Sequence, residues 1–211
     1  MKLVFPRLYV ILDAVLLADS LFSCAKALAE SGVELMQVRD KQASSRKLFE
    51  VHSELEQQLR PLGVKTVVND RPDVAAVVGA GGVHVGQQDL SPEQARVIVG
   101  GGCVVGVSTH TWEQFEAANA GCADYIAVGP VFATQTKAQA DPVVGLDFVR
   151  RARSVARKPL VAIGGITLER AGDVWAAGAD CVAVARDVIC ASNPARRAAD
   201  YLALAAVTKR G

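Results

Sequence analysis

The chain has 211 residues, of which 51% are hydrophobic and only 5% are aromatic. Its 23 Lys and Arg residues balance 22 Asp and Glu residues, so it lacks the net positive field that favours binding to nucleic acid or to an anionic membrane. The length suits one compact domain over residues 1–211, with an interior built from aliphatic side chains.

The N-terminal segment does not resemble a secretory signal. Its apolar run is short and is followed at once by Pro6 and Arg7, and about 18 uncharged apolar residues never occur together. The five cysteines are widely spaced and include no CxxC pair, which favours reduced thiols. We therefore expect a soluble cytoplasmic protein; the sequence leaves open whether it forms a homo-oligomer.

Short apolar segments alternate with longer segments of helical periodicity along the whole chain. The eight expected strands are residues 8–12, 35–38, 66–68, 82–85, 104–107, 125–128, 160–163 and 181–184. Ser91 and Thr111 are each followed three residues later by Gln, a capping-box pattern that predicts the start of a helix. We expect a single (β/α)8 barrel rather than an open doubly wound sheet, and we look for function just after each strand.

Charged residues follow the second expected strand, in the segment Gln37, Val38, Arg39, Asp40 and Lys41. Side chains alternate in an extended segment, so Gln37, Arg39 and Lys41 are expected on the same side. Two cations beside an amide favour a clamp for a diphosphate, although a surface row of salt bridges is an equally good interpretation of the pentapeptide alone.

Carboxylates follow the next two strands. Asn69 and Asp70 come after the third, and Asp89 comes after the fourth. Loops after neighbouring strands adjoin in a barrel, so the two aspartates could bind one hard cation such as Mg²⁺, with water and phosphate oxygens completing its shell. Each acid alone is more simply a helix cap or a solvated residue, and the nearby Arg39 and Lys41 are what favours the metal site.

The fourth and fifth strands add two histidines and a serine. His84 lies inside a strand, where a hydrogen-bonded core residue is the favoured interpretation over a direct catalytic role. Ser108 lies nearest the end of the fifth strand and is expected to face the pocket, whereas His110 is expected at the start of a helix.

A long polar stretch follows the sixth strand and extends to Gly145. It contains Thr134, Gln135, Thr136 and Lys137, and loops of this length are uncommon unless they are functional. We interpret it as a lid that carries hydroxyl groups and a lysine over bound phosphate, with a flexible linker as the alternative.

A double glycine follows the seventh strand and leads directly into a helix. The amides around Gly165 and the start of that helix are expected to form an anion cradle. Ala185 and Arg186 follow the eighth strand, and loops seven and eight commonly share a phosphate site in barrels of this type.

Seven segments in chain order carry a resemblance to one family. They are Leu8–Asp13, Gln37–Lys41, Val68–Arg71, Gly82–Asp89, Gly106–Thr111, Gly129–Lys137 and Ala162–Ile166. Through these segments the chain resembles the thiamine-phosphate synthase family over nearly its whole length.

The resemblance implies a transferase that condenses 4-amino-5-hydroxymethyl-2-methylpyrimidine diphosphate with 4-methyl-5-(2-phosphooxyethyl)thiazole, or its carboxylated form. The products are thiamine phosphate and diphosphate. It implies Mg²⁺ at Asp70 and Asp89. The residues that it assigns to the pyrimidine diphosphate are Gln37, Arg39, Lys41, Asn69, Ser108 and Lys137, and those for the thiazole phosphate are Thr134, Thr136, Gly165, Ala185 and Arg186. Val38, Asp40 and Gln135 lie between these residues and are expected at the same sites.

Arg39, Lys41, Ser108 and Lys137 are the expected catalytic residues. No loop presents a coupled nucleophile and base, and none is needed if the diphosphate departs before the thiazole nitrogen attacks. Arg186 is a departure, because the family often has a small hydroxyl residue there; its guanidinium could hold the thiazole phosphate or pair with Asp187.

Two alternatives stay open. A thiazole tautomerase would share the fold and the phosphate cradle without needing a metal diphosphate, and Asn69, Asp70 and Asp89 argue against it. A non-catalytic phosphate-binding barrel would not need the cations Arg39, Lys41 and Lys137, all of which are present.

Overall fold

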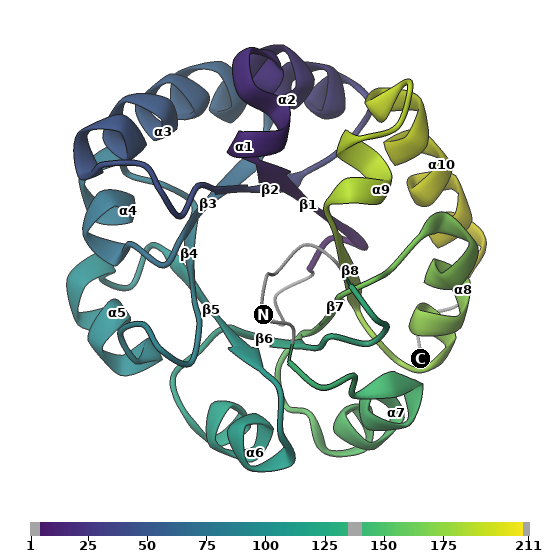
Figure 1. The fold of residues 1–211 in the computed structure, drawn as a ribbon. Coiled ribbons are helices and arrows are strands. Elements are labelled where there is room, and N and C mark those ends of the chain that lie inside the picture. Colours follow the sequence, from purple (N-terminus) through teal and green to yellow (C-terminus); the bar gives the residue numbers. More distant parts are fainter. Residues whose placement is uncertain (1–4, 135–140, 209–211) are drawn as a thin grey trace.

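Eight parallel strands close into a barrel, in which each strand pairs with the next along the chain and the eighth pairs with the first (Figure 1). The computed structural model describes residues 5–134 and 141–208. The strands are β1 (Leu8–Asp13), β2 (Leu35–Arg39), β3 (Lys65–Asn69), β4 (Gly82–Val85), β5 (Val104–Thr109), β6 (Tyr125–Val128), β7 (Leu160–Ile163) and β8 (Cys181–Val184). The predicted (β/α)8 barrel is therefore confirmed.

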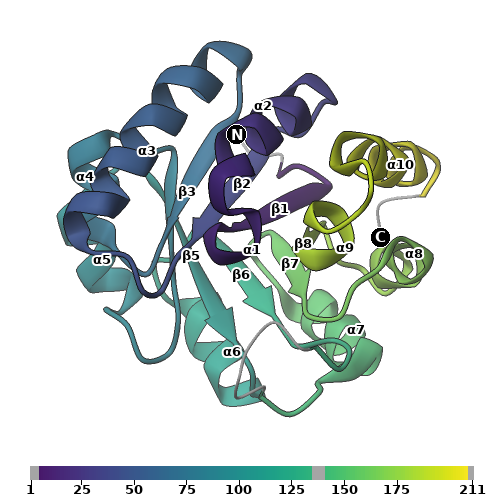
Figure 2. The ribbon, with the colours of Figure 1, turned by 45° about the horizontal axis from the view of Figure 1, so that its top comes forward.

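Helices surround the barrel on its outside (Figures 1 and 2). They are α1 (Ala14–Leu17), α2 (Leu21–Glu30), α3 (Ser45–Leu59), α4 (Pro72–Val78), α5 (Pro92–Val99), α6 (Trp112–Ala120), α7 (Gly145–Val155), α8 (Leu168–Ala176), α9 (Arg186–Ile189) and α10 (Pro194–Val207), with short 3-10 turns at Ala18–Ser20 and Arg60–Leu62. Among the described residues, no helix is both long enough and apolar enough to cross a membrane.

Four strands begin or end at different residues from those predicted, and the difference concerns polar residues. The structure extends the strands through Asp13, Arg39, Asn69 and Thr109, which we had placed in loops. Asp13 and Arg39 are partners in the β1–β2 register, so both still belong to the ladder. Polarity at the end of a barrel strand thus marks the functional mouth rather than the end of pairing.

Alternation along the strands separates two buried layers. The inner layer fills the barrel, and its members include Phe5, Tyr9, Ile11, Leu35, Val67, Tyr125, Ala127, Val161, Cys181 and Ala183. The outer layer packs between the strands and the helices and includes Val10, Val38 and Val68. Phe5 contacts Tyr125 with ring centroids 4.8 Å apart, so an aromatic pair fills part of the barrel interior.

The two helix starts that were predicted from capping boxes are confirmed. Ser91 and Thr111 both form complete capping boxes with Gln94 and Gln114. At the helix ends, Gly79 forms a left-handed cap at φ +66°, whereas Gly121 after α6 has φ −74°. Gly121 provides space instead, since a Cβ there would lie 3.0 Å from Oε1 of Glu93.

Candidate active site at the carboxyl ends of the strands

Lys41, Asp70 and Asp89 come together from the loops after β2, β3 and β4. Nζ of Lys41 lies 3.2 Å from Oδ2 of Asp70. Asp70 is fixed by its backbone, which has φ +61° and donates its N–H to the carbonyl of His84 at 2.8 Å. Asp89 is fixed by the N–H of Gly86, which donates to its Oδ2 at 2.8 Å. Both carboxylates are thus held in place before any ligand binds.

Asp89 has a raised pKa, which reflects its crowded position. Burial raises the pKa of this carboxyl above its usual range, and the nearby Asp70 carboxyl raises it further, while Gly86 and Lys41 act against these effects. Two carboxylates that repel each other lower their energy by sharing a cation, which fits a hard divalent ion. No third His, Cys, Asp or Glu completes a metal-binding group within the described residues, so water or substrate oxygens would have to complete the shell.

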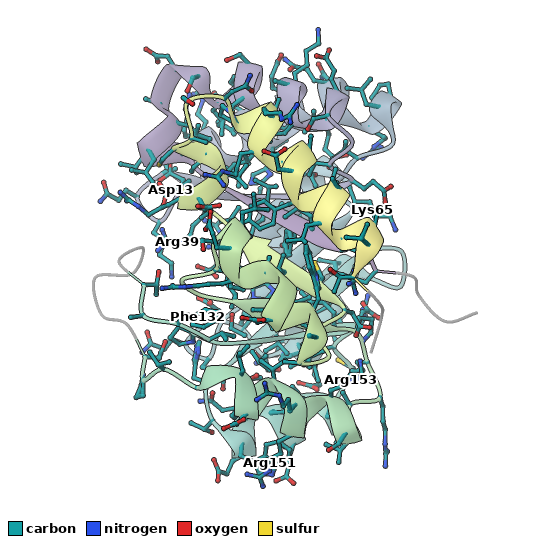
Figure 3. All side chains as sticks on the ribbon, turned by 90° about the vertical axis from the view of Figure 1, so that its right-hand side faces the viewer. Asp13, Arg39, Lys65, Phe132, Arg151 and Arg153 are labelled. Carbon is teal, nitrogen blue, oxygen red and sulfur yellow. The ribbon has the colours of Figure 1, made fainter. Side chains whose placement is uncertain are left out.

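Arg39 lies at the same mouth but is paired differently. Its Nη1 donates to Oδ2 of Asp13 at 3.2 Å, while Oδ1 of Asp13 caps α1 by accepting the N–H groups of Val15 and Leu16. Figure 3 shows Arg39 and Asp13 side by side at the end of the barrel that Phe132 also occupies, with Lys65 toward the opposite end. The guanidinium is therefore oriented in advance by a carboxylate that is itself held by helix α1.

Gln37 lies deeper than the rim that we predicted for it. It is buried inside the barrel and donates through Nε2 to the hydroxyl of Tyr9 at 2.8 Å. Ser108 is half-buried and lies 2.8 Å from Nε2 of His84. His84 is a buried, hydrogen-bonded histidine as predicted, with Nδ1 2.9 Å from the hydroxyl of Tyr125.

The remaining residues predicted after β2 and β3 differ in where their side chains lie. Val38 is buried in the outer core between the strands and the helices, so its side chain does not face the mouth. Asp40 accepts the N–H groups of Gln42 and Ala43 and thereby shapes the loop. Asn69 ends β3 beside its register partner His84 and is half-buried.

The predicted phosphate cradle lies where β7 and β8 meet α8 and α9. The amides of Gly165 and Arg186 have no backbone or side-chain acceptor among the described residues. Gly165 has φ +62°, and a Cβ there would lie 2.4 Å from the carbonyl oxygen of Ala133, so only glycine fits. Ala185 precedes α9 and is half-buried, whereas the Arg186 side chain is exposed.

Asp187 does not pair with Arg186 in the way that the sequence left open. Its Oδ2 accepts the hydroxyl of Tyr201 at 2.7 Å and the N–H of Leu168 at 3.2 Å. The first amide of α8 is therefore already satisfied, and the helix start contributes less to anion binding than we expected. Arg170 restrains the cradle by donating to the carbonyl of Gly165 at 2.8 Å.

The loop after β6 is described only at its two ends. Val131 and Phe132 donate their N–H groups to the carbonyls of Ile163 and Gly164 at 2.9 and 3.0 Å, and Arg170 lies 4.8 Å above the Phe132 ring. Thr134 follows this anchored end of the loop and is half-buried. The predicted residues Gln135, Thr136 and Lys137 lie outside the described residues.

His110 connects this loop to β5. It lies just before the first turn of α6, as predicted, and its Nδ1 is 2.6 Å from the carbonyl of Gly129. Its Nε2 lies 3.4 Å from Oδ2 of Asp141, where the described part of the chain resumes. Two loops that follow neighbouring strands are thereby linked through one imidazole.

Sequence reasoning missed three residues of this region. Asp13 orients Arg39, and its position at the end of a strand was the signal that could have revealed it. Tyr9 and Tyr125 were predicted within strands, and alternation would have placed Tyr9 inside the barrel with Ile11. Their hydrogen bonds across the barrel could not be derived from local pattern.

The same family is found in each comparison with known proteins. Residues 8–188 match the family model described as thiamine monophosphate synthase. A thiamine-phosphate synthase of Koribacter versatilis is 48% identical over 202 residues, covering 93% of this chain and 94% of that protein. One from Methanospirillum hungatei is 41% identical, covering 92% of this chain and 97% of that protein. The solved thiamine phosphate pyrophosphorylase from Pyrococcus furiosus superposes with a TM-score of 0.86 at 31% identity, covering 94% of both chains.

Proposed function

Because this chain belongs to the thiamine monophosphate synthase family, we propose that it joins a pyrimidine diphosphate to a thiazole phosphate at the carboxyl-end mouth of the barrel. The chain is a transferase of thiamine biosynthesis. The substrates that we propose are 4-amino-5-hydroxymethyl-2-methylpyrimidine diphosphate and 4-methyl-5-(2-phosphooxyethyl)thiazole, or the carboxylated form of the latter.

The observation that carries this proposal is the cluster of Lys41, Asp70 and Asp89, with Arg39 at the same mouth. The cationic side chains can neutralise phosphate oxygens, whereas the two carboxylates would repel them. Two carboxylates beside a phosphate-binding cation are useful when a divalent ion separates them from the phosphate. A metal-diphosphate ligand accounts for both signs of charge in one place.

Asp70 and Asp89 would hold Mg²⁺ in this arrangement, because their paired carboxylate oxygens suit a hard cation. When bound, Mg²⁺ would act as a Lewis acid on the diphosphate oxygens. Arg39 and Lys41 would bind the same group from the β2 side, and Lys137 would add a third cation on sequence grounds.

The reaction needs no acid or base from the protein. The bond between the pyrimidine methylene carbon and the diphosphate oxygen breaks, and both electrons leave with the diphosphate. The thiazole nitrogen then donates its lone pair to that carbon, and the positive charge ends on the thiazolium ring. The carboxylated thiazole would in addition lose its carboxylate as CO2 and take up a proton from water at the same ring carbon. The contribution of Arg39 and Lys41 is electrostatic, since they stabilise the charge that grows on the departing oxygen.

The second phosphate would bind across the barrel from the first. The amides of Gly165 and Arg186 are available donors there, and Arg170 holds the Gly165 peptide in place. Thr134 lies at the adjoining loop and Thr136 belongs to the same predicted site. This arrangement would orient the thiazole nitrogen toward the centre of the mouth.

A two-substrate assay with product mass measurement tests the function. Purified protein should release diphosphate and form thiamine phosphate only when both substrates and Mg²⁺ are present. Isomerisation of a thiazole carboxylate phosphate without condensation would instead favour the tautomerase alternative. Phosphate binding with no turnover of either kind would favour a non-catalytic barrel.

A further inference from the structure

Five side chains from five strands form a continuous hydrogen-bonded chain through the barrel interior. Gln37 donates to the Tyr9 hydroxyl at 2.8 Å, and that hydroxyl lies 3.3 Å from the hydroxyl of Tyr125. The Tyr125 hydroxyl lies 2.9 Å from Nδ1 of His84, and Nε2 of His84 lies 2.8 Å from Oγ of Ser108. The chain thus begins and ends at residues that we assign to the pyrimidine diphosphate site.

The direction of every link follows from the first one. Each phenol has one hydrogen, and neither Tyr9 nor Tyr125 has another hydrogen-bonding partner among the described residues. Because Gln37 already donates to the hydroxyl oxygen of Tyr9, the hydroxyl hydrogen of Tyr9 can form a hydrogen bond only by pointing to the hydroxyl oxygen of Tyr125. The hydroxyl hydrogen of Tyr125 can then form a hydrogen bond only by pointing to Nδ1 of His84. The reverse direction would leave the Tyr9 hydrogen buried without an acceptor, which is costly.

We propose that Tyr9 and Tyr125 are positioning residues that hold neutral His84 with its proton on Nε2. In this tautomer His84 donates to Oγ of Ser108, and the hydroxyl hydrogen of Ser108 is left to donate into the mouth. That last step rests on the proposed function, because it requires a substrate acceptor there, such as a pyrimidine ring nitrogen or a diphosphate oxygen. The tautomer of His84 does not depend on the proposed function.

The fold provides the space that this chain needs. A Cβ on Gly106 would lie 2.0 Å from Cζ of Tyr125, so β5 must have glycine where the phenol ring crosses the barrel. Burial raises the pKa of both phenols, Tyr9 and Tyr125, so each keeps its single hydrogen at any pH at which the enzyme works.

The tautomer of His84 can be measured directly. The chain has three histidines, so ¹⁵N-histidine labelling with His52→Asn and His110→Asn variants assigns the signals of His84. We expect the attached proton on Nε2 and a non-protonated Nδ1 in the ligand-free protein. A proton on Nδ1 instead would overturn the proposed direction of the hydrogen bonds from Gln37 to Ser108.

Variants separate this role from a merely structural one. Tyr125→Phe keeps the ring and removes the hydrogen donated to Nδ1, so the fixed tautomer should be lost and kcat should fall about three- to tenfold with a smaller change in KM. Tyr9→Phe should act in the same direction and serves if the first variant does not fold. Tyr201→Phe is the control: it removes a phenol hydroxyl that donates to Asp187 and is not part of the hydrogen-bonded row inside the barrel. This variant should leave the His84 signals unchanged.

An unchanged tautomer in both Tyr125→Phe and Tyr9→Phe would refute the positioning role. A wild-type protein that makes no thiamine phosphate would refute the proposed function alone, because the spectroscopic result does not depend on turnover.

Discussion

The ammonium group of Lys41 lies 3.2 Å from Oδ2 of Asp70, so a cationic side chain occupies part of the site that we propose for a divalent cation. The lysine would compete with the metal in the free enzyme and would assist it once diphosphate is bound. These opposite effects can be separated by substitution.

Replacing Lys41 with Met should therefore change metal binding and turnover in opposite directions. Mg²⁺ affinity of the ligand-free protein should rise a few-fold, because a competing exposed ion pair is weak, whereas kcat should fall about a hundredfold because a cation is lost from the leaving group. Calorimetric titration and steady-state assays measure the two quantities. Lys47→Met, at an exposed position on α3, is the matched control and should change neither. A parallel fall in both would contradict this account.

Asp70 requires two variants, because its backbone is left-handed at φ +61°. Asn tolerates this conformation, so Asp70→Asn should fold normally and still lose at least about a hundredfold in kcat. Asp70→Ala should lose activity to the same extent and should also lower the free energy of unfolding by about 1 kcal/mol. Activity and urea unfolding are the measurements. Asp73→Asn, at an exposed aspartate paired with Arg71, should retain activity. Near-normal turnover by Asp70→Asn at limiting Mg²⁺ would remove Asp70 from the metal site.

Gly106 and Gly172 form a matched pair for measurements of stability. Gly106→Ala should destabilise the protein by about 1–3 kcal/mol, because its Cβ would overlap the Tyr125 ring. Gly172→Ala in α8 meets open space and should stabilise the protein by about 0.5–1 kcal/mol through helix propensity. Thermal or urea unfolding compares them, and a harmless Gly106→Ala would mean that Tyr125 does not cross the barrel as described.

His52 should make the protein sensitive to acid. It is fully buried, neither ring nitrogen has a hydrogen-bond partner among the described residues, and burial lowers its pKa from 6.5 to about 4. The unfolded state therefore binds a proton below pH 6.5 that the folded state refuses until about pH 4, so stability falls across this window. At pH 5 the loss should be about 2 kcal/mol.

His52→Leu isolates that effect. The apolar side chain cannot take up a proton, so the difference between wild type and variant should grow as pH falls from 7 to 5 in urea unfolding. A constant difference over this range would show that His52 is not the titrating group.

The barrel could be predicted because each strand carries its own signal. The runs at β4, β6, β7 and β8 were predicted with the bounds that the structure has, since small or polar residues flank each apolar segment. The rim of the site could also be predicted, because loops that follow adjacent parallel strands must adjoin. Asp70 and Asp89 could therefore be placed together from the sequence.

The interior of the site could not be predicted in this way. Gln37 was expected beside Lys41, but strand alternation does not specify depth, and the Tyr9 hydroxyl holds Gln37 below the rim. The sequence left open whether Asp187 pairs with Arg186, and the structure gives Asp187 a partner from a distant part of the sequence, Tyr201 on α10. Both depend on contacts between elements, on which local periodicity carries no information.

In the proposed function, Asp70 and Asp89 bind a metal that holds the leaving diphosphate. Calorimetric titration of inorganic diphosphate into wild-type protein and into the Asp70→Asn/Asp89→Asn double variant, each with and without Mg²⁺, measures whether these two carboxylates are needed for that metal. We predict that Mg²⁺ strengthens diphosphate binding to the wild type and has no such effect on the double variant. Equal strengthening by Mg²⁺ in both proteins would contradict the claim.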